Sequence, residues 1–572
     1  MNDILVMING VRIENYQYGE NHPLGVDNNH IDKVEVIKGP ASLLYGSDAI
    51  GGVINFTKEK PAPTGSLAGS YMTQLHSNTR GINNNISLKG ASENIFGSIS
   101  ANHKTHTDYK QGNGQFVPNS RFNEWSISTN SGYTGKNGTF RVFYDYYNQE
   151  LGMSVPPVQS LVTEANRKNR VWYQDLEHHL VNARNTLFLG DFKWHINGAW
   201  QSALRKLQTE MEDPAVEMRL NTMTFDTKLE LSTRNKINYT LGMQGMNQKN
   251  RNLNNRQSQF LPDANVNNFG ILFLTQYSPT HQFKIQGGIR YDYYRTETFS
   301  QETENHDASL TKDFSNISGS LGATWTLNQK LIFRGNLAKA FRAPNIPELT
   351  SHGMHGTRFE KGNPALSPQN AWETDLSSHF HGDFISFDAA IFYNRINDYI
   401  HLAPTNEVTS ENVSIYQYAQ TDANLFGGEA GLHVHPESAP WLHIKGTWST
   451  VTGKQENGNY LPFIPADKFR YEIRGTKNKL GFIKKTSVKL SALSALKQDQ
   501  PSPGETSTEG YTVIHATING QIQVREKPLD FTLGVNNLFN KEYIDHLSTL
   551  KNLGYRNQGR NVFMTLQFSF GH

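Results

Sequence analysis

Polar and apolar side chains alternate along one segment after another from about residue 66 to the C-terminus. In the segment 385–393, Ile385 and Phe387 fall on one face, while Ser386 and Asp388 fall on the other. The same alternation recurs in the segments 140–146, 192–197 and 562–570. Successive side chains of a β-strand point to opposite faces, so this period of two predicts strands with one apolar and one polar face.

The segments between these predicted strands alternate in length. Short polar turns at 328–330 and 382–383 are separated by long polar segments at 147–181, 248–267 and 401–424. Short turns on one side and long loops on the other are typical of outer-membrane barrels. Roughly 22 strands of about 23 residues, each counted with its loop, would account for the chain from about residue 66 to the C-terminus. A barrel of that size needs an internal plug. We therefore predict a membrane all-β protein with about 22 antiparallel strands closed into a barrel.

Composition excludes several classes of function. The chain has 572 residues and a formal net charge of +2, which is too balanced for a nucleic-acid-binding protein. It contains no cysteine, so disulfides, thiolate metal sites and a cysteine nucleophile are excluded. No G-x-S-x-G or H-E-x-x-H motif is present, and we predict neither an enzyme nor a required cofactor. No stretch approaches the roughly 18 apolar residues of a membrane helix. The composition alone also fits a soluble all-β protein.

The N-terminal region has a different pattern. Val34 to Phe56 (VEVIKGPASLLYGSDAIGGVINF) predicts a strand, a Gly-Pro turn, one helical turn and a second strand. IDKVEVIKGPASLLYGSDAIGGVIN closely resembles the end of the plug domain of TonB-dependent outer-membrane receptors. FTLGVNNLFNKEY and NVFMTLQFSF, near the C-terminus, look like the last two strands of these receptors. The resemblance implies the C-terminal part of an αβ plug at 1–60 inside the barrel lumen, a linker at 61–65 and a barrel at 66–572.

The resemblance also implies a function. Such receptors import a scarce ligand across the outer membrane of a Gram-negative bacterium, driven by the inner-membrane TonB-ExbB-ExbD complex. The expected cargo is an iron complex (a ferric siderophore or haem) or another metal ion, and outer-membrane lipid is the other expected partner. INGVRI normally lies well inside the plug, so the export signal and the TonB contact segment are expected upstream of Met1, and this chain alone is expected not to transport. The alternatives are a zinc or other free-metal receptor, a passive porin and a surface glycan-binding importer.

The segment 341–366 (FRAPNIPELTSHGMHGTRFEKGNPAL) supplies the first candidate ligands. The predicted strand 331–340 leaves a short turn, so His352 and His355 should face the exterior on the long-loop side. They lie three residues apart on a glycine-rich loop and could bind one metal ion if the loop folds back. FRAP, a histidine and NPxL also resemble the segment of haem receptors in which that histidine is an axial ligand. Ordinary polar loop histidines remain the alternative.

The plug loop at 19–27 supplies His22 and Asp27, which should lie at the plug apex. HPLGVD resembles zinc-uptake receptors, in which an Asp-His pair binds metal at this place. Here Asn21 occupies the aspartate position and only His22 matches. The resemblance therefore implies metal candidates at His22, His352 and His355, with a chelated iron species favoured over free zinc.

Glu429, His433 and His435 share one face of the predicted strand FGGEAGLHVH. His433 and His435 alone could share a metal ion, but the short turn after His435 places them at the periplasmic end, where cargo capture is not expected. In the family, basic plug residues pair with barrel glutamates. The resemblance thus implies plug–barrel coupling through these three residues, with Lys38 and Glu429 as a buried pair. A solvated Lys38 and an unrelated Glu429 are the alternative.

Overall fold

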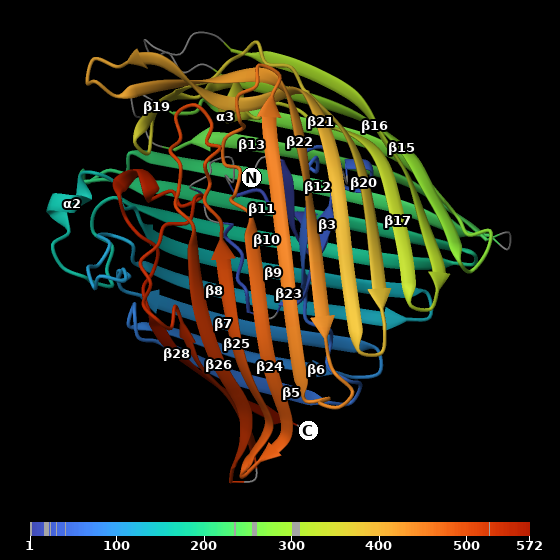
Figure 1. Cartoon of the computed structure of the whole chain (residues 1–572). Coiled ribbons are helices and arrows are strands. Elements are labelled where there is room, and N and C mark those ends of the chain that lie inside the picture. Colours follow the sequence, from blue (N-terminus) through green and yellow to red (C-terminus); the bar gives the residue numbers. More distant parts are fainter. Residues whose placement is uncertain are drawn as a thin grey trace.

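The computed structural model is a closed barrel of 22 antiparallel strands with the N-terminal segment inside it (Figure 1). It describes residues 3–15, 22, 24–29, 31–39, 42–233, 236–253, 260–299, 309–525 and 527–571. The predicted architecture is confirmed. Among these residues the helices are short: α1 (Ser42–Tyr45), α2 (Val158–Leu161), α3 (Ile346–Thr350) and the 3₁₀ turn η1 (Lys551–Leu553). In that described part, no helix has the length and apolarity needed to cross a membrane.

Each barrel strand pairs with the next, and the last strand pairs with the first, which leaves no open sheet edge. The barrel strands are β5 (Leu67–His76), β6 (Gly81–Ala91), β7 (Ile95–His106), β8 (Phe122–Gly135), β9 (Gly138–Gly152), β10 (Tyr173–Leu189), β11 (Phe192–Gln208), β12 (Val216–Ser232), β13 (Ile237–Asn252), β14 (Asp263–Tyr277), β15 (Phe283–Phe299), β16 (Thr311–Asn328), β17 (Leu331–Arg342), β20 (Gln369–His381), β21 (Ile385–Val408), β22 (Ser414–Val434), β23 (Leu442–Gln455), β24 (Lys468–Leu480), β25 (Ile483–Ala495), β26 (Tyr511–Val524), β27 (Lys527–Asn536) and β28 (Asn561–Gly571). In the loop between β17 and β20, β18 (His352–His355) and β19 (Arg358–Lys361) form a hairpin, and β19 also pairs in parallel with β22.

The barrel wall has an apolar outer face and a polar inner face. On β21, Ile391 and Tyr393 are exposed on the outside, whereas Asn394 is buried and donates a hydrogen bond to Glu373 on β20. Exposed apolar side chains recur around the barrel, as expected for a surface that contacts lipid. The period of two in the sequence therefore reports which side chains face the membrane.

The two ends of the barrel differ in loop length. Turns such as 92–94 and 190–191 are short, whereas the connections 153–172, 343–368 and 537–560 at the other end are long. The barrel begins at the short-turn end, because Leu67 on β5 pairs with Gly90 next to the turn 92–94. In outer-membrane barrels the short turns are periplasmic and the long loops are extracellular.

The N-terminal segment forms a small sheet in the order β2-β1-β4-β3. Its strands are β1 (Ile4–Ile8), β2 (Val11–Arg12), β3 (Ile31–Lys38) and β4 (Gly52–Lys58). The predicted strand, helical turn and strand correspond to β3, α1 and β4, coloured blue in Figure 1. Leu5, Met7, Ala49 and Val53 pack together as one apolar core of this plug.

Buried polar contacts hold the plug against the barrel wall. Arg342, at the end of β17, is 2% exposed, and its Nε lies 3.0 Å from Oδ1 of the plug residue Asp3. Its Nη1 lies 2.8 Å from Glu348 on α3. Lys58 of the plug lies 2.9 Å from Asp145 on β9. Buried charges are costly without partners, so these pairs fix the plug in one position inside the lumen.

We expect Gly52→Ala to loosen the plug while the barrel stays closed. Gly52 has φ +129°, and a Cβ there would lie 2.3 Å from the carbonyl oxygen of Ile37. The cost should be about 1–3 kcal/mol of local stability. Hydrogen exchange of the plug amides in the folded protein measures it. Gly446→Ala on β23 is the control, because a Cβ there meets nothing within 4 Å; equal plug protection in both variants would contradict the expectation.

Candidate ligand-binding site

A pocket lies where the plug meets the long-loop end of the barrel. His22 enters it from the plug and Arg205 from β11. Met354, His355 and Glu360 enter it from the outer hairpin β18–β19. The pocket therefore brings three separate parts of the chain to one place, and it opens on the side where extracellular ligands arrive.

The rings of His22 and His355 meet edge to face, with centroids 5.4 Å apart. Arg205 Nη1 lies 2.6 Å from His22 Nε2. A guanidinium only donates hydrogen bonds, so Nε2 of His22 is the acceptor. Arg205 thus occupies the nitrogen of His22 that a metal would use. A metal or metal chelate that bound Nε2 of His22 would therefore displace the Arg205 guanidinium.

His355 is held from the other side by a buried carboxylate. Its Nδ1 lies 3.1 Å from Oε1 of Glu360, and Arg358 Nε donates to the same oxygen at 2.9 Å. Burial raises the pKa of Glu360, but the hydrogen bond and charge of His355 and those of Arg358 outweigh it, so the net pKa is below the usual range. With Nδ1 engaged, Nε2 is the nitrogen that His355 can offer to a ligand.

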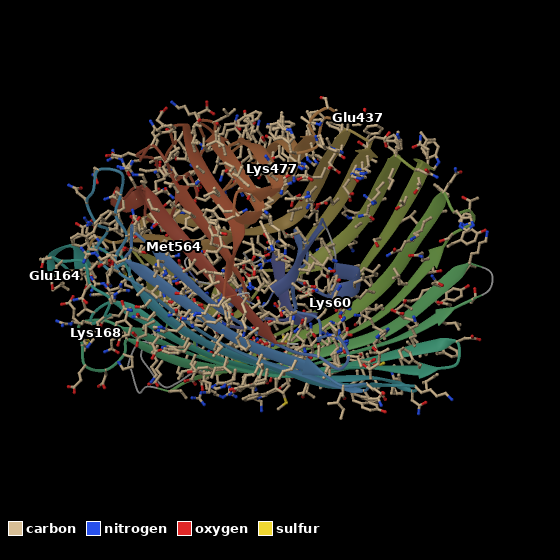
Figure 2. The ribbon with its side chains drawn as sticks, turned by 90° about the horizontal axis from the view of Figure 1, so that it is seen from below. Lys60, Glu164, Lys168, Glu437, Lys477 and Met564 are labelled. Carbon is tan, nitrogen blue, oxygen red and sulfur yellow. The ribbon has the colours of Figure 1, made fainter. Side chains whose placement is uncertain are left out.

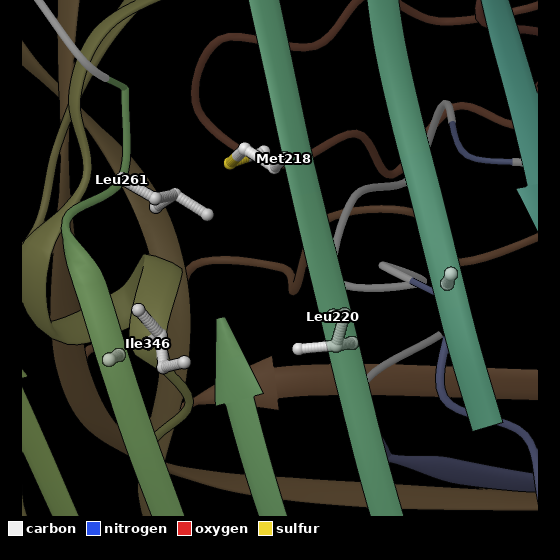
Figure 3. Packing of buried hydrophobic residues seen from close by; sticks show 6 residues of the cluster. Met218, Leu220, Leu261 and Ile346 are labelled. Atoms are coloured by element: carbon white, nitrogen blue, oxygen red, sulfur yellow. The ribbon is translucent and has the colours of Figure 1, made fainter. Parts of the chain in front are cut away.

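The rest of the pocket is mainly apolar. Phe260 packs against the His355 ring with centroids 5.2 Å apart. Met218 and Leu261 line the cavity and belong to a buried cluster with Leu220 and Ile346, which Figure 3 shows from close by. Such a wall, with a few polar groups converging on one side, is the usual construction of a small-molecule site.

His352 does not join His355 at this site. Both lie on the short strand β18, where residues three apart point to opposite faces. His352 packs instead against Phe359, with ring centroids 5.1 Å apart. This corrects the expectation that the two histidines share one metal ion. In the described ranges, no group of three or more His, Asp or Glu side chains could hold a metal ion.

Asp27 contacts the barrel rather than the pocket. It is 7% exposed, and its Oδ2 accepts hydrogen bonds from Ser126 Oγ at 2.6 Å and from Asn102. Lys104 Nζ lies 3.7 Å from its Oδ1. This corrects its expected role as a cargo ligand, because its carboxylate already joins the plug to β7 and β8. Asn21, the other residue of the expected pair, lies outside the described residues.

Lys38 and Glu429 form an ion pair between plug and barrel, but not a buried one. Their side chains are 65% and 45% exposed, which corrects the expectation of burial. Near the short turn, His433 Nε2 lies 3.2 Å from Nδ1 of His443 on β23, and the ring of His435 packs beside both. His443 was not predicted, because only the pairing of β22 with β23 brings it there.

Comparison with known proteins identifies the family. The TonB dependent receptor-like β-barrel model matches residues 55–538, and the TonB-dependent receptor plug domain model matches residues 1–53. The chain belongs to the TonB-dependent receptors. The resemblance stated from the sequence is confirmed, and the protein is an outer-membrane receptor of a Gram-negative bacterium. Members of this family are transporters and receptors rather than enzymes, and they bind a ligand and interact with TonB.

Curated relatives and solved structures support the same assignment. The probable TonB-dependent siderophore receptor PirA of Acinetobacter baumannii is 21% identical over 94% of this chain and 80% of its own. The hemin receptor of Yersinia enterocolitica is 22% identical over 94% of this chain and 81% of its own. The solved structure of the copper transporter OprC has the same fold, with a TM-score of 0.82 and 17% identity over 99% of this chain and 90% of its own.

We expect the hairpin β18–β19 to open when Glu360 is protonated. Because the pKa of Glu360 in the folded protein is below its usual value of 4.5, the stabilisation that the ionised carboxylate gives the hairpin is present above pH 4.5 and is lost as the pH falls further. Glu360→Gln should remove it at all pH values, at a cost of about 1–3 kcal/mol. Hydrogen exchange of the hairpin, corrected for intrinsic rates, measures both effects.

The matched control for that experiment is Glu407→Gln. Glu407 lies 3.8 Å from Lys361 of the same hairpin, but its side chain is 67% exposed. An exposed pair contributes little, so this variant should keep the wild-type pH profile. Equal effects of the two substitutions, or a hairpin that tightens in acid, would contradict the role of Glu360.

Proposed function

We propose that this receptor takes up an iron complex, either a ferric siderophore or haem, which binds in the pocket between His22 and the hairpin β18–β19. The TonB-ExbB-ExbD complex would supply the energy for transport by acting on the plug. The observation that carries the proposal is the meeting of a plug imidazole with an outer-hairpin imidazole in one pocket. The names of the relatives PirA and the hemin receptor point to the same class of cargo.

The pocket has the chemistry for such a cargo, because a mainly apolar wall faces a few converging polar groups. The Phe260 and Met218 side chains suit the apolar part of a chelate, and Arg205 suits its carboxylate or other anionic oxygens. An imidazole from His22 or His355 would then serve as a ligand or a hydrogen-bonding partner of the metal centre.

Cargo binding at this place would also act on the plug. A cargo that takes Nε2 of His22 displaces Arg205, which removes a direct hydrogen bond between the plug and β11. A ligand shifts a conformational equilibrium only by its different affinity for the two states. The lost Arg205–His22 contact provides such a difference, because the loaded plug would be held to this strand less tightly.

A soft metal ion, copper above all, is the second candidate cargo. Met153, Met218 and Met354 line the same pocket as His22 and His355. Thioether sulphur and imidazole nitrogen favour Cu(I), whereas zinc prefers histidine, cysteine and carboxylate ligands. The copper transporter OprC has the same fold, which makes this candidate worth a direct test. Zinc is the weaker free-metal alternative, because no group of three zinc-type ligands occurs in the described ranges.

The first test is binding of haem and of a panel of ferric siderophores to the purified receptor in detergent. His22→Ala and His355→Ala should each weaken binding of the true cargo by about tenfold or more, since each removes a charge-assisted or metal-directed contact. His352→Ala is the matched control, because His352 belongs to the same hairpin but faces away from His355. Unchanged affinity in the first two variants would contradict the proposed site.

The second test separates an iron complex from copper. Leucine is close to methionine in volume but lacks the sulphur, so Met153→Leu, Met218→Leu and Met354→Leu together should preserve chelate binding and abolish Cu(I) binding. Wild-type protein that binds Cu(I) tightly and no iron complex would favour the second candidate. Growth of a deletion strain that carries the receptor gene, on defined iron, haem, zinc and copper sources with and without TonB, identifies the transported cargo.

A further inference from the structure

The hairpin formed by β24 and β25 has an unusual charge. Residues 473–498 contain seven Lys or Arg residues and no Asp or Glu, in a chain with 54 basic and 52 acidic residues. The turn 481–482 places the tip of this hairpin at the short-turn end, which is the periplasmic side. The fold and the cargo pocket make no use of this concentration of charge.

The basic side chains at the tip lie on the outer face of the barrel. Tyr471 and Ile473 on β24 are exposed to the membrane side. Because side chains alternate along a strand, Lys477 and Lys479 continue the same face toward the tip. Both lysines are exposed, and Figure 2 labels Lys477. They therefore project toward lipid or headgroups rather than into the lumen.

Trp441 marks the membrane boundary beside these lysines. It is 55% exposed, and a Cβ on Gly475 would lie 3.6 Å from Trp441 Cε3, so the indole covers the outer face of β24 at Gly475. Tryptophan is enriched at the level of the lipid headgroups. Lys477 and Lys479 follow Gly475 by about 7 and about 14 Å along the strand, which places them at the phosphates and just beyond.

The cross-strand register leaves positive charges facing each other. Lys479 pairs directly with Lys484 on β25, and like charges directly opposite destabilise a sheet. Lys477, Lys479, Lys484 and Lys485 are all exposed, and within the described part of the chain they form no ion pair. An anion outside the protein would relieve this repulsion.

We propose that the tip of the β24–β25 hairpin binds the phosphate headgroups of anionic phospholipids in the periplasmic leaflet of the outer membrane. Apolar side chains accompany the lysines, because Leu480 is 49% and Phe482 is 78% exposed at the same tip. Basic and apolar side chains together fit a lipid, whose headgroup and acyl chain are both within reach, better than a free phosphate ion. The contact ties one side of the barrel to the inner leaflet and fixes its depth there.

The test compares lipid retention by the full chain and two triple variants, measured by native mass spectrometry after exchange into detergent containing phosphatidylglycerol or phosphatidylcholine. Lys477→Gln with Lys479→Gln and Lys484→Gln should weaken phosphatidylglycerol binding by about a hundredfold, because each lysine near an anionic surface contributes about fivefold. Replacing the same three lysines with arginine should preserve retention. Heat-modifiable migration on gels verifies that each barrel is folded.

The control variant combines Lys136→Gln, Lys193→Gln and Lys236→Gln, which removes the same charge from exposed lysines at other short turns. It should retain phosphatidylglycerol as the wild type does. Phosphatidylglycerol should also raise the wild-type Tm more than that of the tip variant, and inorganic phosphate at the same concentration should not. Equal retention in the tip and wild-type proteins, equal losses in both glutamine variants, or stabilisation by inorganic phosphate alone would overturn the proposal.

Discussion

The pairing of polar groups across the boundary between plug and barrel is the interaction on which the rest of this structure depends. A barrel of 22 strands has a polar lumen, and its inward-facing charges need partners or water. Arg342 with Asp3, Lys58 with Asp145, and Ser126 with Asp27 supply such partners from opposite sides of the boundary. These contacts fix where the plug apex lies, and so they fix where His22 meets the outer hairpin.

The same physical argument links cargo binding to transport. Breaking the contact between Arg342 and Asp3 would leave the buried Arg342 guanidinium with one partner fewer, so this pair is suited to holding the plug at rest. The Arg205–His22 hydrogen bond is different, because it borders the cargo pocket and competes with a cargo for the same nitrogen. The receptor thus combines charge pairs that hold the plug with a hydrogen bond, between Arg205 and His22, that a cargo can replace. In the proposed function, that contact is the one by which the plug senses whether the site is occupied.

The barrel could be predicted from the sequence because its signal is local. Alternation within each segment, as in Ile385 to Phe387, reports the membrane-facing side without knowledge of the neighbouring strands. The site could be predicted only in part. His22 and His355 were candidates from residue type and resemblance, and they meet in one pocket, but Arg205 and His443 reach their partners through strand register, which no local pattern encodes. The positions of His352 and Asp27 outside this pocket could not be predicted, because the hairpin β18–β19 and the barrel contacts of the plug arise from tertiary packing.

The most direct test of the account is a crosslink between plug and barrel wall. The chain contains no cysteine, so Lys38→Cys combined with Glu429→Cys introduces a single pair of thiols. Lys38 of the plug and Glu429 of β22 form an exposed ion pair that contributes little to stability, so a bifunctional thiol reagent that spans the two replaced side chains should join the two positions in the folded protein in high yield. Each single variant should give no crosslink. A folded, heat-modifiable barrel in which the double variant does not crosslink would place the plug elsewhere, and the cargo site built on its position would be contradicted.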